Sequence, residues 1–253
     1  MVNFGCQLSS ISPYLDTIDH IDEAFQKLSE MGCRYVQLQG IPLSVPDMQI
    51  AAACNAHGLT CIGVQEEYPF GFGADPERYI ERALACEADY LTFSMIPPQI
   101  NTFDKLKRFA ASVTKIYQSV KAAGLTFTYH PAEIDYRMIG KIPAFDRLMD
   151  LLPEDVQLTF CIHSVFGKIP YMQVLGKYAG RMDIVHVKDS IVRADGAVQL
   201  MPLGEGDHNW QPILKACTEA GAKYILTDQE NWDRDAFQCT EISLEYLHKL
   251  NLL

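Results

Sequence analysis

The 253-residue sequence is short of positive charge. It carries 21 lysine and arginine residues against 32 aspartate and glutamate residues, which gives a formal net charge of −11 at pH 7. Nucleic-acid binding depends on clustered cations that neutralise phosphates, and no basic cluster occurs in the sequence. Nucleic acid is therefore excluded as an expected partner, although a single phosphate could still bind in one local pocket.

Long apolar runs are also missing. No run approaches the roughly 20 apolar residues that a membrane-spanning helix needs, so no membrane partner is expected. The first residues, Met1 to Gly5, lead directly into an apolar strand pattern, with no basic segment or cleavage site ahead of it. These two observations favour a cytoplasmic location.

The eight cysteines include no CxxC pair. Most of them lie within apolar segments, which is typical of buried, reduced thiols in a cytosolic protein. Cys161 stands out because it precedes a candidate metal ligand, His163, by two residues. We expect buried free thiols.

A regular alternation of short β-type runs with longer helical segments dominates the sequence. The short runs are apolar and rich in Val, Ile, Tyr, Phe and Thr, as in strands buried on both faces. Strands are expected at Asn3–Leu8, Tyr35–Gln39, Thr60–Gln65, Tyr90–Met95, Thr126–His130, Gln157–His163, Asp183–Lys188 and Tyr224–Gln229. Strands that alternate with helices indicate a parallel sheet.

Helix ends support the same count. The segment Ile21–Met31 has apolar side chains on one helical face, and Gly32 follows it directly. Glycines 58, 124, 180 and 221 also follow predicted helices, at the position that needs a positive φ. Eight units in 253 residues favour one α/β domain over residues 1–253, a single (β/α)8 TIM barrel. No GxGxxG, linker or low-complexity stretch supports a dinucleotide-binding fold or a second domain.

Metal-capable side chains end four consecutive predicted strands. Enzymes with this fold carry their active sites at the carboxyl ends of the strands, and these ends hold His130, His163, His186 and Asp228. A lone strand histidine is more often a core residue, but three of the seven histidines fall here. The cluster predicts one divalent transition metal (Mn, Co, Fe, Ni or Zn), because imidazole with carboxylate suits these ions better than Mg or Ca. A polar pocket without metal is the alternative.

Longer motifs surround the same strand ends. They are Tyr129-His130, Val185-His186-Val187-Lys188-Asp189, Pro202-Leu203-Gly204-Glu205-Gly206 through Trp210, and Asp228-Gln229-Glu230-Asn231. Together they resemble the sugar phosphate isomerase/epimerase family of the xylose-isomerase-like TIM barrels, and looser similarity extends nearly end to end. The resemblance implies a metal-dependent enzyme with a small carbohydrate or polyol as substrate, without identifying that substrate.

The resemblance also implies a ligand set. Similar family members hold one divalent metal through Glu on strand 5, Asp on strand 6, His on strand 7 and Glu on strand 8. Here His186 fits the histidine position, and Asp228 fits the last position with a shorter carboxylate. His130 and His163 stand in place of the other two carboxylates, and Gln37 replaces the family's frequent glutamate on strand 2. Such a site carries less negative charge and lacks the facing carboxylates of a two-base epimerase.

In the mechanism that the resemblance implies, a metal grips a carbonyl and an adjacent hydroxyl and stabilises an enediolate. The candidate bases for the carbon proton are Asp228, Glu230, Glu133, Asp135 and Glu205, although Glu205 could equally be a solvated loop residue. Lys188 shares a strand face with His186, so it could neutralise an oxyanion or pair with Asp189. Expected substrate contacts are Glu67, Glu133, Tyr136 and Trp210.

Three functions remain open. The leading hypothesis is a metal-dependent sugar, or sugar-derivative, isomerase or epimerase. A keto-sugar or keto-inositol lyase or dehydratase shares the enolisation step but expels a hydroxyl, for which one base suffices. A barrel that binds a ligand without catalysis is the third reading, because two of the four family ligand positions are substituted. The glycine-flanked segment 66–73 is consistent with a lid, and a homo-oligomer is compatible with all three readings.

Overall fold

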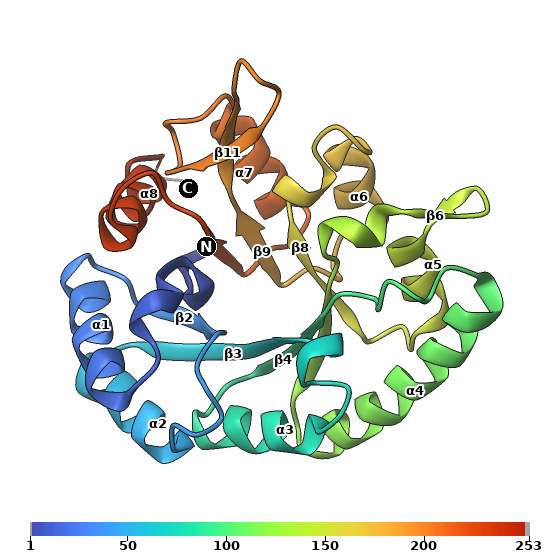
Figure 1. Ribbon diagram of the computed structural model, residues 1–253, viewed down its shortest axis with the longest axis horizontal. Coiled ribbons are helices and arrows are strands. Elements are labelled where there is room, and N and C mark those ends of the chain that lie inside the picture. The colour runs from blue at the N-terminus through green and yellow to red at the C-terminus, as the bar shows by residue number, and fades with distance from the viewer. Residues whose placement is uncertain (1, 251–253) are drawn as a thin grey trace.

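The computed structural model describes residues 2–250, and its centre is a closed parallel barrel (Figure 1). The barrel strands are β1 (Asn3–Gln7), β2 (Tyr35–Leu38), β3 (Thr60–Glu67), β4 (Tyr90–Ser94), β5 (Thr126–His130), β8 (Gln157–Cys161), β9 (Ile184–Val187) and β12 (Tyr224–Thr227). Each strand pairs in parallel with its neighbours, and β1 pairs with β12 to close the sheet. The predicted single TIM barrel is confirmed.

Helices surround the barrel (Figure 1). The α-helices of the described residues are α1 (Ile18–Glu30), α2 (Asp47–Ala56), α3 (Pro76–Ala85), α4 (Phe103–Ala122), α5 (Ala144–Leu151), α6 (Tyr171–Lys177), α7 (Trp210–Glu219) and α8 (Ala236–Leu250). Short 3-10 helices are η1 (Leu8–Tyr14), η2 (Tyr68–Phe70), η3 (Glu133–Tyr136) and η4 (His163–Val165). None of the described helices is long and apolar enough to span a membrane.

Local sequence explains where the helices begin and end. The side chain of Thr17 accepts a hydrogen bond from the backbone N–H of His20 and caps the start of α1. The apolar face of this helix, which includes Ile21, Phe25 and Leu28, is fully buried. Glycines 32, 58, 124, 180 and 221 all have positive φ values, between 64° and 102°, as the sequence predicts for residues that follow a helix.

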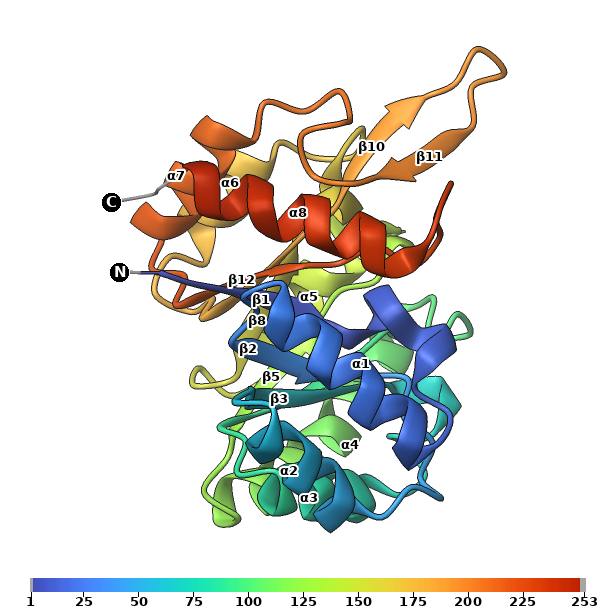
Figure 2. The ribbon, with the colours of Figure 1, turned by 90° about the vertical axis from the view of Figure 1, so that its left-hand side faces the viewer.

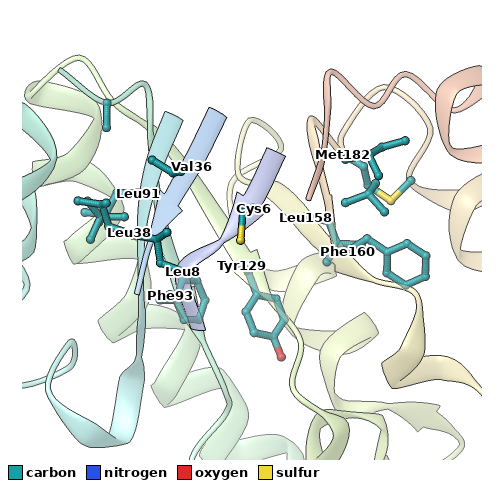
Figure 3. Close-up of a cluster of buried hydrophobic side chains, with 14 of the residues drawn as sticks. Cys6, Leu8, Val36, Leu38, Leu91, Phe93, Tyr129, Leu158, Phe160 and Met182 are labelled. Carbon is teal, nitrogen blue, oxygen red and sulfur yellow. The ribbon is translucent and has the colours of Figure 1, made fainter. Parts of the chain in front are cut away.

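The apolar core lies between the barrel and the helices (Figure 3). Phe93 is central to it, with stacked contacts to Phe72, Phe127 and Tyr129 at ring-centroid distances of 6.3, 5.2 and 4.8 Å. All eight cysteines are free and buried, which confirms the expected thiols. Because Phe72 is fully buried, segment 66–73 is anchored to the core, which does not favour its reading as a lid.

Two antiparallel ribbons lie outside the barrel. β6 (Met138–Ile139) pairs with β7 (Ile142–Pro143), and β10 (Asp189–Val192) pairs with β11 (Val198–Met201). The β10–β11 ribbon follows β9 directly and extends away from the barrel (Figure 2). Lys188 is the single residue between β9 and this ribbon, so both elements fix its backbone.

Candidate functional site

A cavity of about 320 Å³ lies at the carboxyl ends of the barrel strands. Val198 and Leu200 of the β10–β11 ribbon border it, and the rest of its lining is mostly polar. The polar side chains of the lining are Gln39, Gln65, Glu67, Ser94, His130, Glu133, His163, Ser164, Lys188, Glu230 and Asn231. A second cavity of about 300 Å³, between α2 and α3, is lined largely by small apolar side chains and cysteines.

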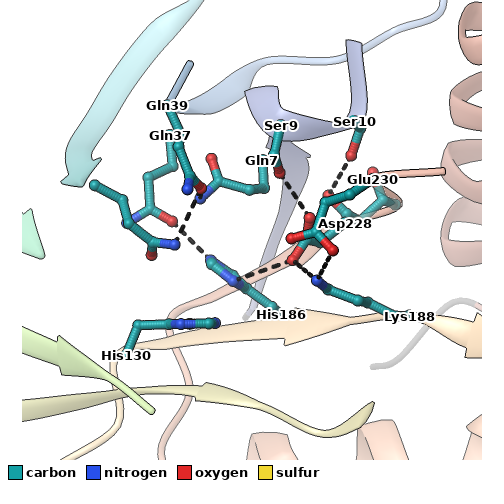
Figure 4. A network of polar contacts seen from close by, with 12 residues as sticks. Gln7, Ser9, Ser10, Gln37, Gln39, His130, His186, Lys188, Asp228 and Glu230 are labelled. Atoms are coloured by element: carbon teal, nitrogen blue, oxygen red, sulfur yellow. Dashed lines mark hydrogen bonds and ion pairs between the residues drawn. The ribbon is translucent and has the colours of Figure 1, made fainter. Parts of the chain in front are cut away.

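Lys188 supplies a positive charge inside the strand-end cavity. Its Nζ lies 2.8 Å from Oδ2 of Asp228 and 2.7 Å from Oε2 of Glu230, and the side chain is buried (Figure 4). Burial alone would lower the pKa of this ammonium group, but attraction to the two carboxylates raises the pKa above its usual value. Lys188 is therefore charged at every physiological pH.

The two carboxylates differ in their surroundings. Asp228 is buried, and the Ser9 hydroxyl donates a hydrogen bond of 2.7 Å to its Oδ1. Burial would raise the pKa of Asp228, but Lys188 and His186 together lower it to about 2. Glu230 is half-exposed, and repulsion by Asp228, with burial, raises the pKa of its carboxyl. Asp228 is thus a fixed anion, whereas Glu230 is the more basic of the two.

His186 of β9 is fully buried, and its ring faces Gln37 of β2 and Asp228 after β12. Its Nε2 lies 2.7 Å from Oε1 of Gln37, whose own amide nitrogen donates to Thr92. With the Gln37 amide in this orientation, Nε2 of His186 is the donor, and Nδ1 carries the lone pair. Nδ1 lies 3.5 Å from Oδ2 of Asp228. Burial lowers the pKa of His186 to about 4, so the ring is neutral at pH 7.

Two further histidines border the cavity. His130, at the end of β5, lies with Nδ1 3.0 Å from the Ser94 hydroxyl, and its ring centroid is 4.9 Å from that of His186. His163 begins η4, so the predicted strand ends two residues earlier, at Cys161. Burial lowers the pKa of both, that of His163 to about 4. Within the described residues, Nε2 of His130 and Nδ1 of His163 have no hydrogen-bond partner.

The four predicted metal ligands do not form a ligand shell. Nowhere in residues 2–250 do three His, Cys, Asp or Glu side chains come together in a way that could hold a metal ion. The reason is visible at Asp228, whose Oδ2 contacts the ammonium of Lys188 instead of being shared with several imidazoles. These side chains therefore do not fit the predicted four-ligand site, and the metal itself stays a prediction from the sequence.

The other predicted site residues divide into two groups. Glu67 and Glu133 line the cavity, Glu133 in an ion pair of 2.8 Å with Lys168. Burial, with repulsion by neighbouring carboxylates, raises the pKa of Glu67. Outside the cavity lining lie Tyr136, buried against Phe145; Trp210, buried near Phe166 and His208; and Glu205, paired with Arg234 at 2.8 Å.

Sequence reasoning missed the amide cluster on the first three strands. Oε1 of Gln39 accepts hydrogen bonds from both Gln7, at 2.9 Å, and Gln65, at 3.1 Å. These glutamines stand at alternate positions with Gln37 and Glu67 in otherwise apolar strands. Polar residues with period 2 in a buried strand are the signal that could have found them.

In the comparison with known proteins, one family model covers most of the chain. A family model described as "Xylose isomerase-like TIM barrel" matches residues 25–247. No curated protein matches the chain.

Solved structures share its fold. Two, named sugar phosphate isomerase/epimerase from Parabacteroides distasonis ATCC 8503, superpose with TM-scores of 0.82 and 0.79 at 15% and 19% identity. The superpositions cover 99% and 100% of this chain and 95% and 99% of those chains. A 3-keto-D-glucoside 4-epimerase from E. coli superposes with a TM-score of 0.70 at 16% identity, over 98% of this chain and 100% of that one. At these identities the likeness is one of fold.

Proposed function

The chain belongs to the xylose isomerase-like TIM barrel family, and on that basis we propose that it is a sugar isomerase or epimerase that works through an enediolate. The observation that carries the proposal is the ammonium of Lys188, fixed between Asp228 and Glu230 at the cavity. An enediolate forms when a carbonyl oxygen gains negative charge, and a preorganised cation at that oxygen lowers the barrier.

The substrate class follows from the cavity lining. Amide, hydroxyl, imidazole and carboxylate groups from several strand ends surround about 320 Å³. Such a lining suits a compound with many hydroxyl groups, because each of them can then exchange its water for a protein partner. The proposed substrate is a small carbohydrate or polyol that carries a carbonyl group.

Proton transfer at carbon needs a base beside the carbonyl. Glu67 at the end of β3 and Glu230 after β12 both border the cavity, and the pKa of each is raised. A higher pKa makes each carboxylate a stronger base than a free one. One of them takes the proton from the carbon next to the carbonyl, while Lys188 holds the resulting oxyanion.

For an epimer, the other carboxyl group enters the reaction protonated and gives its proton to the opposite face of the same carbon, after which exchange with water resets both groups. The unpaired ring nitrogens of His130 and His163 hydrogen-bond substrate hydroxyls and orient the carbon chain. The predicted ligand set lacks the two facing carboxylates of a two-base epimerase. In this proposal, Glu67 and Glu230 supply them. No step of the proposal uses a metal, since the described residues do not form a metal site.

Solvent exchange tests the proposal across a range of candidate substrates. The protein is incubated in D₂O with a panel of aldoses, ketoses and keto-sugars, and proton NMR follows the carbon next to the carbonyl. An enediolate predicts loss of that proton signal together with formation of an isomer or epimer. Glu67→Gln and Glu230→Gln should slow the exchange, and the exposed Glu154→Gln is the control.

Two results of this experiment contradict the proposal. An unsaturated product with a cleaved carbon–oxygen bond would assign the lyase function. Absence of exchange with every compound of the panel, by protein with a normal thermal unfolding curve, would favour the ligand-binding barrel.

A further inference from the structure

The sequence prediction and the structure differ in the cation at this site. The sequence predicts a divalent metal, whereas the structure has the Lys188 ammonium beside Asp228. Of the predicted ligands, Asp228 lies with Oδ2 2.8 Å from Nζ of Lys188 and 3.5 Å from Nδ1 of His186. Figure 4 shows the ammonium end of Lys188 beside Asp228 and Glu230, with the ring of His186 directed to the same carboxylate. The ammonium therefore contacts the carboxylate oxygen that faces Nδ1 of His186.

We infer that the Lys188 ammonium takes the place of a divalent metal, so that this site holds no metal and uses a lysine as its only electrophile. The inference deepens the proposed function, on which its catalytic part rests. Its metal-binding part concerns the protein alone and is tested without substrate.

Geometry gives the first argument. A metal in such a site lies about 2.0–2.2 Å from its oxygen and nitrogen donors, so it must bond Oδ2 of Asp228 and Nδ1 of His186, which are 3.5 Å apart. Nζ of Lys188 is already 2.8 Å from the same Oδ2. A metal on that oxygen would be in close contact with an ammonium group, and like charges at that distance repel strongly in a buried site.

Charge gives the second argument. The Lys188 ammonium contacts the carboxylates of both Asp228 and Glu230, at 2.8 and 2.7 Å. A divalent ion bound to the same two carboxylates would lie beside the cation that already contacts both of them. Replacement of one cation by the other is favoured over coexistence.

Lysine can perform the electrophilic role. An ammonium has three N–H donors, and contacts with two carboxylates leave one for a substrate oxygen. Both the β9 strand and the β10–β11 ribbon fix the lysine backbone, which limits reorganisation when a carbonyl oxygen becomes negative.

Metal titration tests the inference directly. Full-length protein is dialysed against EDTA and then titrated with Co²⁺, with binding followed by calorimetry and by the visible absorption of the ion. The wild-type protein should bind no stoichiometric Co²⁺, and solvent exchange of its substrate should be the same before and after EDTA. Lys188→Ala should bind one Co²⁺ per chain, at least about tenfold tighter than wild type. Lys115→Ala, which removes an exposed lysine on α4 outside the cavity lining, should behave like wild type.

Several outcomes would overturn the inference. One is tight, stoichiometric Co²⁺ binding by the wild-type protein that His186→Ala abolishes. Another is loss of exchange activity on EDTA treatment with recovery on metal addition. A third is a folded Lys188→Ala variant that binds Co²⁺ no more tightly than wild type; if this variant does not fold, Lys188→Met takes its place with the same expected result. If no compound of the panel shows solvent exchange but Co²⁺ binding is as expected, the proposed function is contradicted and the metal-binding inference is not.

Discussion

Lys188 and Asp228 form a buried ion pair across neighbouring strands, with Nζ and Oδ2 2.8 Å apart. The lysine follows β9 and the aspartate follows β12, so the pair links the last two strands of the barrel at the cavity. Ser9, just after β1, binds the other oxygen of the same carboxylate. The aspartate thereby ties three adjacent strand ends together.

Loss of this aspartate should destabilise the fold more than loss of the second carboxylate. Asp228→Asn leaves the buried ammonium with only Glu230, and removal of one partner from a buried pair costs about 3 kcal/mol or more. Glu230→Gln should cost at most about 1 kcal/mol, because the Glu230 side chain is half-exposed to water. Urea unfolding at pH 7 measures both free energies, and equal losses would contradict the central position of Asp228.

The general base should be found on β3. Glu67→Gln should lower the rate of solvent exchange into substrate by on the order of 100-fold or more, as expected when a general base is lost. Glu66→Gln is a matched control, because Glu66 is the preceding residue and does not line the cavity. Exchange rates measured by NMR at saturating substrate should separate the two variants. A comparable loss in both would mean that β3 is disturbed as a whole.

The buried histidines should make the fold sensitive to mild acid. Burial lowers the pKa of His186 and His163 to about 4 and also lowers that of His130. In an unfolded chain, the pKa of an imidazole is about 6.5. Between these values the unfolded state binds protons that the folded state does not. Stability is therefore complete above about pH 6.5 and falls as the pH falls toward 4, by roughly 3 kcal/mol for His186 alone.

A substitution at His186 tests the predicted direction of this pH dependence of stability. The slope of the unfolding free energy between pH 6.5 and 4.5 should be smaller in His186→Gln than in wild type, as measured by urea titration at several pH values. The exposed His248→Gln should retain the wild-type slope. A slope that is unchanged in His186→Gln would mean that this ring is protonated in the folded protein.

The sequence predicted the barrel well because the relevant signal is local. Apolar runs with β-branched residues define strands, and glycines 32, 58, 124, 180 and 221 mark the ends of five helices. Thr126–His130 was predicted to the residue, and most other strands differ only at their carboxyl ends. Those ends are where the backbone leaves the sheet, as at Cys161, and where propensity no longer decides the conformation.

The chemistry of the site was harder to predict because it depends on contacts between distant residues. Position along a strand correctly placed His186, Lys188 and Asp228 together. It suggested Asp189 as the partner of Lys188, but the lysine contacts Asp228, and Asp189 instead accepts hydrogen bonds from backbone N–H groups of residues 190, 204 and 206. The choice of partner depends on side-chain conformation across two strands that are far apart in sequence. Glu205 was predicted from the freedom of its glycine-flanked loop, but it pairs with Arg234, whose position comes from a different loop.

Two glycines with opposite surroundings give a final test of the barrel. A methyl group on Gly5 of β1 would lie 2.1 Å from the carbonyl oxygen of Tyr35 in β2, so the two strands could not keep their spacing. Gly5→Ala should destabilise the protein by several kcal/mol, at least as much as the roughly 1–3 kcal/mol typical of overpacking. Gly176 in α6 has no atom within 4 Å of such a methyl group and needs no positive φ.

Gly176→Ala should therefore stabilise the protein by about 0.5–1 kcal/mol, because alanine loses less backbone entropy in a helix. Thermal and urea unfolding of both variants measure the difference. The two substitutions must change the free energy of unfolding in opposite directions, because the same added methyl group meets backbone in one place and open space in the other. A Gly5→Ala protein as stable as wild type would mean that β1 and β2 do not pair in the register Gly5–Tyr35.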